Sequence, residues 1–310
     1  RDVIVELGRT SKKDARPEDF DRIGTEYHRW VRNNRQLMGL ETSDDYHRWI
    51  VKDLDYFAQL FIKLLDASAT RTQGLESVRY NADHGFTQQL QFLLAPVVAN
   101  EGMALSLQKA GLVADFLDCW LNRRLWNFKS NSYSSMQYTI FILGKDVRGK
   151  SLDELRSYLI ERLEAEDKSL GFDQPTYLNQ WSAKSLHRQL ARFTDWLEQQ
   201  TGLPGRYLEY IKRSGKHAYE IEHIWANHYQ RHIAEFPQQK DFDDWRNNIG
   251  GLLLLPKKVN ASLNDMTYPD KLPHYIKENL LAQSLHPLAY KNHPGFKQAM
   301  TEHGLSFREH

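Results

Sequence analysis

The feature that most constrains the fold is a short apolar run, Leu252-Leu253-Leu254-Leu255, set between two glycines and Pro256. The length of this run and the residues that bracket it predict a β-strand. Residues 219–225 alternate in polarity, as another strand would. They place Tyr219, Ile221, His223 and Trp225 on one face and Glu220, Glu222 and Ile224 on the other.

A short helix is predicted directly after the second strand. Residues 257–264 can open a helical turn, and Asn260 and Asn264 then lie one turn apart on the same face. A further helix is expected near residues 272–281. The C-terminal third of the chain therefore has the predicted order strand, loop, strand, helix.

The first two hundred residues have a different pattern. Apolar residues recur at steps of three and four, and Ser43-Asp44 can cap the first such segment. We therefore predict a helical bundle over residues 1–200 and a second domain over residues 201–310, with the boundary near the Gly/Pro break at 201–205. The predicted helices cover residues 44–69, 86–99, 105–126, 152–163 and 186–197.

Composition excludes several classes of protein. The 310 residues carry 41 Lys+Arg and 40 Asp+Glu, so any affinity for nucleic acid must come from a local basic surface. The single cysteine, Cys119, excludes a disulfide framework and a cysteine-based zinc cluster, and it suits a reducing, cytoplasmic location. No apolar run approaches the roughly 20 residues that span a bilayer, so we expect no membrane partner. Because the chain begins with Arg1, we expect it to be part of a longer protein.

The C-terminal order of elements resembles the plan of a ββα-metal nuclease. In such a site a histidine takes a proton from water, and a hard divalent cation with oxygen ligands neutralises the charge that builds on the phosphate. His223 fits the role of general base, and Asn260 and Glu222 fit the role of metal ligands. An asparagine hydrogen-bonded to the histidine would hold the tautomer that leaves the other ring nitrogen free.

Several short motifs make the resemblance more specific. They include Glu-Ile-Glu-His-Ile at 220–224, Arg-Asn-Asn-Ile-Gly at 246–250, Asn-Ala-Ser at 260–262, Tyr-x-x-Lys at 268–271 and Leu-Ala-Gln-Ser-Leu-His-Pro at 281–287. Their order resembles the C-terminal HNH domain of GmrSD-type, modification-dependent restriction enzymes. The most similar subtype is the phosphorothioation-linked phage-defence nucleases of the SspE type.

This resemblance implies a function and partners. It implies a metal-dependent DNA endonuclease or nickase in anti-phage restriction, acting on phage double-stranded DNA with Mg²⁺ or Mn²⁺. It also implies a nucleotide-hydrolysing sensor domain on the N-terminal side of the same longer protein. No P-loop is evident in the 310 residues, so we assign no nucleotide hydrolysis to this chain.

The sequence departs from the family pattern at two positions. Many relatives have an asparagine directly after the Ile-Gly pair, where this chain has Gly251, so either Asn247 or Asn248 must supply the middle residue. We prefer Asn247. Glu222 stands where many ββα-metal sites have aspartate, and its extra methylene changes the geometry available to a metal.

Five basic residues are candidates for DNA contact: Lys257, Lys258, Lys271, Arg123 and Arg124. Lysines near the predicted site could contact phosphates, although exposed lysines are common. Arg123 and Arg124 lie among aromatic residues, a combination that can grip phosphates and stack bases. We favour the alternative for these arginines, in which the aromatics are core and the arginines pack beside them.

Two other functions are compatible with the same residues. The HNH scaffold could survive without catalysis as a DNA-binding or interaction module, since Gly251 replaces a motif residue. Alternatively, His228 and His232, four residues apart, could join His223 or Glu222 to hold a structural zinc. Without the intervening glutamate of a metalloprotease motif this second pattern is a weak signal.

Overall fold

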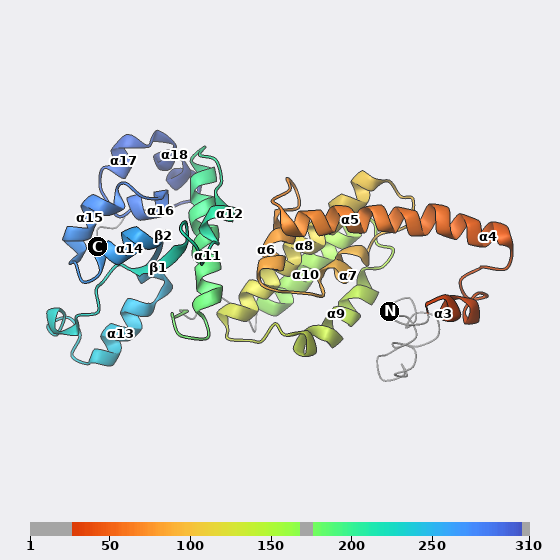
Figure 1. Ribbon diagram of the computed structural model, residues 1–310, viewed down its shortest axis with the longest axis horizontal. Helices are drawn as coiled ribbons and strands as arrows, with labels where there is room; N and C mark the ends of the chain where they lie inside the picture. Colours follow the sequence, from red (N-terminus) through yellow and green to blue (C-terminus); the bar gives the residue numbers. More distant parts are fainter. Residues whose placement is uncertain (1–26, 168–175, 306–310) are drawn as a thin grey trace. The chain divides into compact units, whose positions relative to one another are not determined.

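The protein is mostly helical, as the sequence predicted. The computed structural model describes residues 27–167 and 176–305, and the chain divides into two compact units, Arg1–Phe172 and Asp173–His310. Figure 1 shows the helices of each unit and a single short two-stranded ribbon in the second. No helix in the described part of the chain is long and apolar enough to cross a membrane.

The first unit is a helical bundle around a large apolar core, with a small separate cluster of Trp30, Val31 and Leu40 among its earliest described residues. Its central helix, α8, buries small and large apolar side chains alternately, among them Ala110, Val113, Leu117 and Leu121. Its helices are α3 (Tyr27–Asn33), α4 (Ser43–Arg48), the π-helical segment η2 (Trp49–Leu54), α5 (Asp55–Ala69), α6 (Glu76–Asp83), α7 (Gln89–Leu94), α8 (Met103–Trp126), α9 (Tyr133–Val147) and α10 (Leu152–Asp167).

Two predicted helices of this unit differ in detail from the observed ones. The segment predicted at 44–69 is helical throughout, but η2 interrupts it, and Thr42 caps it together with Asp45. The segment predicted at 86–99 is much shorter, because α7 ends at Leu94. Pro96 has no N–H with which to continue the helical hydrogen bonds.

The boundary between the units lies earlier than the sequence suggested. Helix α11 (Ala183–Gln200) was expected in the N-terminal bundle, whereas it belongs to the second unit. It packs against α12 (Tyr207–Tyr210), β2 and α16, so its apolar face completes the C-terminal core. The Gly/Pro break at 201–205 is therefore a turn inside the second unit.

The ribbon at the centre of the second unit is formed by the two predicted strands. Strand β1 (Tyr219–His223) pairs antiparallel with β2 (Leu252–Pro256), and the register places Tyr219 opposite Pro256 and His223 opposite Leu252. The four leucines of β2 are buried, and α14 (Lys257–Leu263) follows at once and packs on both strands. Strand, strand and helix thus occur where the sequence predicted them.

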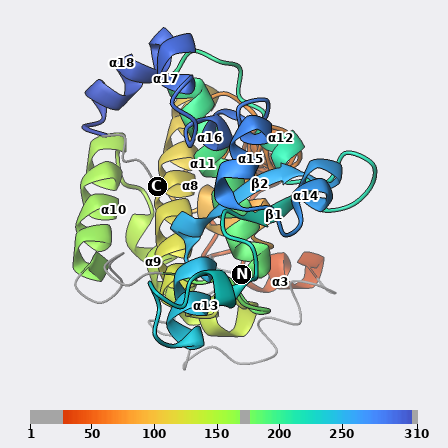
Figure 2. The same ribbon diagram turned by 90° about the vertical axis from the view of Figure 1, so that its left-hand side faces the viewer.

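The remaining helices surround the ribbon, as both views show (Figures 1 and 2). The helix predicted near 272–281 is divided in two, because Asn279 interrupts it and caps the second part through the Ala282 amide. These elements are η3 (Tyr229–Arg231), α13 (Gln239–Asn247), η4 (Ile249–Gly251), α15 (Tyr268–Tyr275), α16 (Leu280–Gln283), α17 (Ala289–Asn292) and α18 (Pro294–Glu302).

Candidate active site

The histidine at the end of β1 is held by the last residue of α13. His223 Nε2 lies 2.9 Å from Asn247 Oδ1, and Asn247 Nδ2 donates to the backbone oxygen of Asp243 at 2.8 Å. The second contact fixes which end of the Asn247 amide faces the histidine, because only the amide nitrogen can donate to a carbonyl. Oδ1 therefore accepts a hydrogen bond from the N–H at His223 Nε2, and Nδ1 is left as the unprotonated nitrogen.

The environment keeps the His223 imidazole neutral. Burial, with a contribution from the nearby positive charge of Arg246, lowers the pKa of His223 from its usual 6.5 to about 4, against the opposing effect of the Asn247 hydrogen bond. At neutral pH the ring is therefore uncharged and can accept a proton. Arg246 is itself held in place by a hydrogen bond from its Nε to the backbone oxygen of Trp225 at 2.9 Å.

Of the two candidate asparagines, only Asn247 meets the histidine in the structure. Asn248 lies at the start of η4, where its side chain accepts from the Gly250 amide at 2.9 Å. Gly251 is closely approached by backbone, since a Cβ there would lie 3.0 Å from the Arg246 carbonyl oxygen. In this chain a side chain at position 251 would press against α13, and the amide beside His223 comes from α13 instead.

Glu222 takes part in a buried ion pair rather than facing an open site. Its Oε1 accepts from Lys271 Nζ at 2.6 Å and from the Tyr275 hydroxyl at 2.9 Å, and Lys271 also donates to the His223 backbone oxygen at 2.8 Å. Glu222 is 5% exposed and Lys271 is 1% exposed. The structure thus gives Lys271 a different position from the predicted phosphate contact, because its ammonium is enclosed between β1 and α15.

A second acidic residue of β1, Glu220, contacts the candidate asparagine of α14. Asn260 Nδ2 donates to Glu220 Oε2 at 3.2 Å, and Lys257 Nζ lies 3.2 Å from Glu220 Oε1. The Asn260 hydrogen bond, together with Lys257, lowers the pKa of the Glu220 carboxyl and keeps it ionised. Within the described residues no hydrogen bond joins this pair directly to His223.

The residues that could hold a divalent cation are therefore Glu220 and Asn260. Mg²⁺ is commonly bound through one or two carboxylates, with water in its remaining positions, so a carboxylate and an amide oxygen are a fitting donor set. Glu220 is only partly buried and can be reached from solvent, whereas both contacts of Glu222 in the structure are to buried groups. Glu222 as a metal ligand stays a prediction from the sequence.

An open cavity of about 230 Å³ is lined by residues that adjoin His223 and Asn247 in sequence. Ile224 and Trp225, which follow His223, line one part of it, and Trp245 and Asn248, on either side of Asn247, line another. Trp245 is 62% exposed, an unusual position for so large an apolar ring. His223 and Asn247 themselves are not among the residues that line the cavity, which is formed by their neighbours in sequence.

The other sequence candidates are spread over both units. Lys257 pairs with Glu220, and Lys258 is exposed at the start of α14. In the first unit, Arg123 donates to the Leu163 backbone oxygen, while Arg124 donates to Asn131 and stacks on Trp120 at 5.4 Å. Both arginines have partners within the first unit, and a DNA contact by either stays a prediction.

The histidines of the zinc alternative do not converge. His228 Nε2 lies 3.4 Å from Asp265 Oδ2, while His232 stacks on the Trp225 ring at 4.9 Å between centroids. Residues 229–231 form only a single 3₁₀ turn, so the helical spacing assumed for the pair is absent. Across residues 27–167 and 176–305, no three His, Cys, Asp or Glu side chains come together in a way that could hold a metal.

Glu220 is the site residue that sequence reasoning missed. The signal was present, because residues 220 and 222 share a face of the strand and Asn260 follows β2 at the distance of one short helical turn. The sequence favoured Glu222 over Glu220 because Glu222 directly precedes His223. Only the packing of α14 on β1 shows which of the two glutamates meets Asn260.

The second unit is thus a mostly helical domain built on a β-ribbon, with a neutral histidine held at the end of β1 and a carboxylate–amide pair, Glu220–Asn260, on the other face of the same strand. Residues 141–292, or 152 of the 310 residues, match the family model of GmrSD restriction endonucleases, C-terminal domain. The match supports a nuclease of the restriction-endonuclease type, which acts on DNA. Comparison with curated proteins and with solved structures gave no match.

Proposed function

We propose that the chain is a metal-dependent HNH-type DNA endonuclease or nickase of anti-phage restriction, with its reaction centre at the end of β1. The observation that supports it best is the His223–Asn247 pair, together with the family match over residues 141–292. An unprotonated ring nitrogen on a neutral histidine is what a general base for phosphodiester hydrolysis requires.

In this proposal His223 Nδ1 takes the proton from the attacking water. Asn247 accepts from Nε2–H, so it stabilises the tautomer needed before the reaction and the imidazolium formed during it. Asp243 acts one step further away, through the backbone oxygen that orients the Asn247 amide. The chain of contacts from Asp243 to His223 is therefore a positioning device.

The proposed cation is Mg²⁺ or Mn²⁺, held by Asn260 with Glu220 or Glu222. When bound, a divalent cation would neutralise charge on the scissile phosphate and the leaving oxygen. Of the two glutamates, we favour Glu220 because it contacts Asn260 and its carboxylate is accessible. Lys271 and Tyr275 then act by fixing the buried carboxylate of Glu222 and thereby the end of β1.

The biological setting is also part of the proposal. We propose that the chain works in the cytoplasm as the effector part of a longer protein, with phage DNA as substrate and an N-terminal nucleotide-hydrolysing sensor as partner. The phosphorothioation-linked subtype remains the preferred one, on the motifs at 220–224 and 281–287.

A supercoiled-plasmid assay tests this function. Wild-type protein is incubated with Mg²⁺, Mn²⁺ or EDTA, beside His223→Ala and the control His228→Ala, which removes a partly exposed histidine that contacts Asp265. The expected result is open-circle or linear DNA with either metal, from wild type and His228→Ala only. Metal-independent binding of DNA without cleavage would instead support the non-catalytic module, and stoichiometric zinc in the purified protein would support the zinc scaffold.

A further inference from the structure

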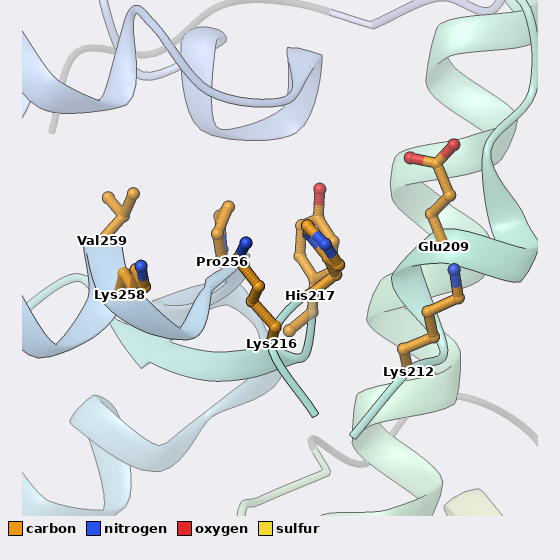
Figure 3. Close-up of a pocket in the computed structure, with 8 residues that line it drawn as sticks. Glu209, Lys212, Lys216, His217, Pro256, Lys258 and Val259 are labelled. Carbon is orange, nitrogen blue, oxygen red and sulfur yellow. The ribbon is translucent and has the colours of Figure 1, made fainter. Parts of the chain in front are cut away.

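A second cavity of the same unit is lined by three lysines. It has a volume of about 490 Å³ and opens between the end of α12 and the start of α14. Figure 3 shows Lys258 on one side, Lys212 on the other, and Lys216 rising from the turn that precedes β1. Three separate segments thus bring ammonium groups to one hollow, which we call the lysine pocket.

The charges of the lysine pocket are not balanced by the protein. None of the three ammonium groups forms an ion pair with a carboxylate in the described part of the chain, and Glu209 is the one acidic residue among those that line the pocket. Three lysines against one glutamate leave a net charge of +2 with His217 neutral, although the whole chain has a formal charge of only +1. A concave surface of one sign concentrates counter-ions, so the pocket favours an anion.

The walls between the lysines are apolar. Tyr219, Pro256 and Val259 line the pocket beside the three lysines. A ligand that combines a negative group with less polar parts fits such a lining better than a small free ion does. A phosphodiester with its attached sugars has this composition.

The position of the lysine pocket relates it to the proposed reaction centre. Lys257 and Lys258 are consecutive, and the first contacts Glu220 while the second lines the pocket. Tyr219 is the neighbour of Glu220 and lies at the opposite end of β1 from His223. At about 3.3 Å per residue, the two ends of the strand are roughly 13 Å apart, which is about four phosphate steps along the axis of a DNA strand.

We propose that the lysine pocket binds a backbone phosphate of DNA several nucleotides from the bond that is cleaved. The proposal rests on the proposed nuclease function and adds a binding site to it. Because the pocket is remote from His223, it contributes to DNA affinity and to the placement of the strand, and not to the chemical step. Phosphate contacts of this kind fix register without reading sequence.

The test measures DNA binding in EDTA, so that cleavage does not interfere. Binding of a labelled DNA duplex is followed by fluorescence anisotropy between 50 and 200 mM salt for the full chain and for Lys212→Gln/Lys216→Gln/Lys258→Gln. The control replaces three exposed lysines of the same unit that lie outside the pocket, Lys277→Gln/Lys291→Gln/Lys297→Gln. Circular dichroism confirms that both variants are folded.

The expected result is a change in salt dependence that is confined to the pocket variant. Losing one phosphate contact reduces the slope of log K against log salt by about 0.9, which amounts to about 15-fold weaker binding at 50 mM salt if the remaining contacts are unchanged. The control variant should keep the wild-type slope.

Other outcomes would overturn the proposal in distinct ways. If pocket and control variants bind DNA alike while wild type still binds it, the lysine pocket has no part in DNA binding and the proposed nuclease function is unaffected. If inorganic phosphate shifts the NMR signals of the Val259 methyl groups while the DNA slope is unchanged in the pocket variant, the pocket takes a free phosphate instead. If wild type binds no DNA at any salt concentration, the proposed function itself fails.

Discussion

The buried pair Lys271–Glu222 gives the sharpest prediction about stability. Lys271→Met removes the ammonium that contacts Glu222 Oε1 at 2.6 Å and the His223 backbone oxygen at 2.8 Å, and it leaves a carboxylate that is 5% exposed without its counter-charge. Truncating one partner of a buried ion pair costs about 3–5 kcal/mol, a large share of the stability of a typical domain. We therefore expect the second unit to lose a large part of its free energy of unfolding.

The magnitude can be measured by urea unfolding, with hydrogen exchange of the β1 and β2 amides to assign the loss to the second unit. A loss of about 4 kcal/mol corresponds to a fall in Tm of roughly 14 °C for a unit of this size. The control Lys277→Met replaces an exposed lysine just beyond α15 and should change the free energy of unfolding by less than about 0.5 kcal/mol.

A double variant separates the charge from the packing. Glu222→Gln in the Lys271→Met background removes the uncompensated charge and keeps an acceptor for the Tyr275 hydroxyl, so it should recover much of the loss. If Lys271→Met costs less than about 1 kcal/mol, or if the second substitution makes the loss larger, the reasoning about this buried pair is refuted.

Three further predictions concern the candidate site. First, because burial lowers the pKa of His223 to about 4, the folded state favours the neutral ring; the resulting stability is complete above pH 6.5 and is lost as the pH falls toward 4. Unfolding experiments should show up to about 3 kcal/mol of this loss in wild type but not in His223→Gln, and an identical pH profile for both would contradict the assignment. Second, Asn247→Ala should slow cleavage by about 10–100-fold because the imidazole of His223 loses its hydrogen-bond partner. Asn248→Ala should mainly destabilise η4. Equal cleavage rates for the two variants would contradict the assignment of Asn247 as the residue that holds His223. Third, Glu220→Gln should raise the Mg²⁺ concentration needed for half-maximal cleavage. Glu222→Gln should leave that concentration unchanged and lower the stability of the fold. The reverse pattern would show that Glu222 is the metal ligand.

The sequence predicted the local elements of the second unit well. The alternation at 219–225 and the leucine run at 252–255 each required a strand, and the two strands pair in the structure. It was less informative about boundaries. Helix α11 has the same periodicity as the helices of the first unit, and periodicity does not say which core an apolar face will join.

Side-chain partners were harder to predict than backbone elements. Glu222 precedes the histidine in sequence, yet in the structure it pairs with Lys271 of α15. Asn260 of α14 instead forms a hydrogen bond with Glu220. The same holds for Asn247 and Asn248, which are equivalent in composition and differ only in their place at the end of α13. Such partners depend on tertiary contacts that a one-dimensional pattern does not contain.

The central claim is that His223 is the base of a phosphodiester hydrolysis. The most direct measurement is the single-turnover cleavage rate of supercoiled DNA by wild type and His223→Ala, at protein concentrations where both bind the DNA to the same extent. Our account predicts cleavage by wild type with Mg²⁺, and a loss of at least about 100-fold in His223→Ala with DNA binding retained. A variant that binds and cleaves at the wild-type rate would contradict it.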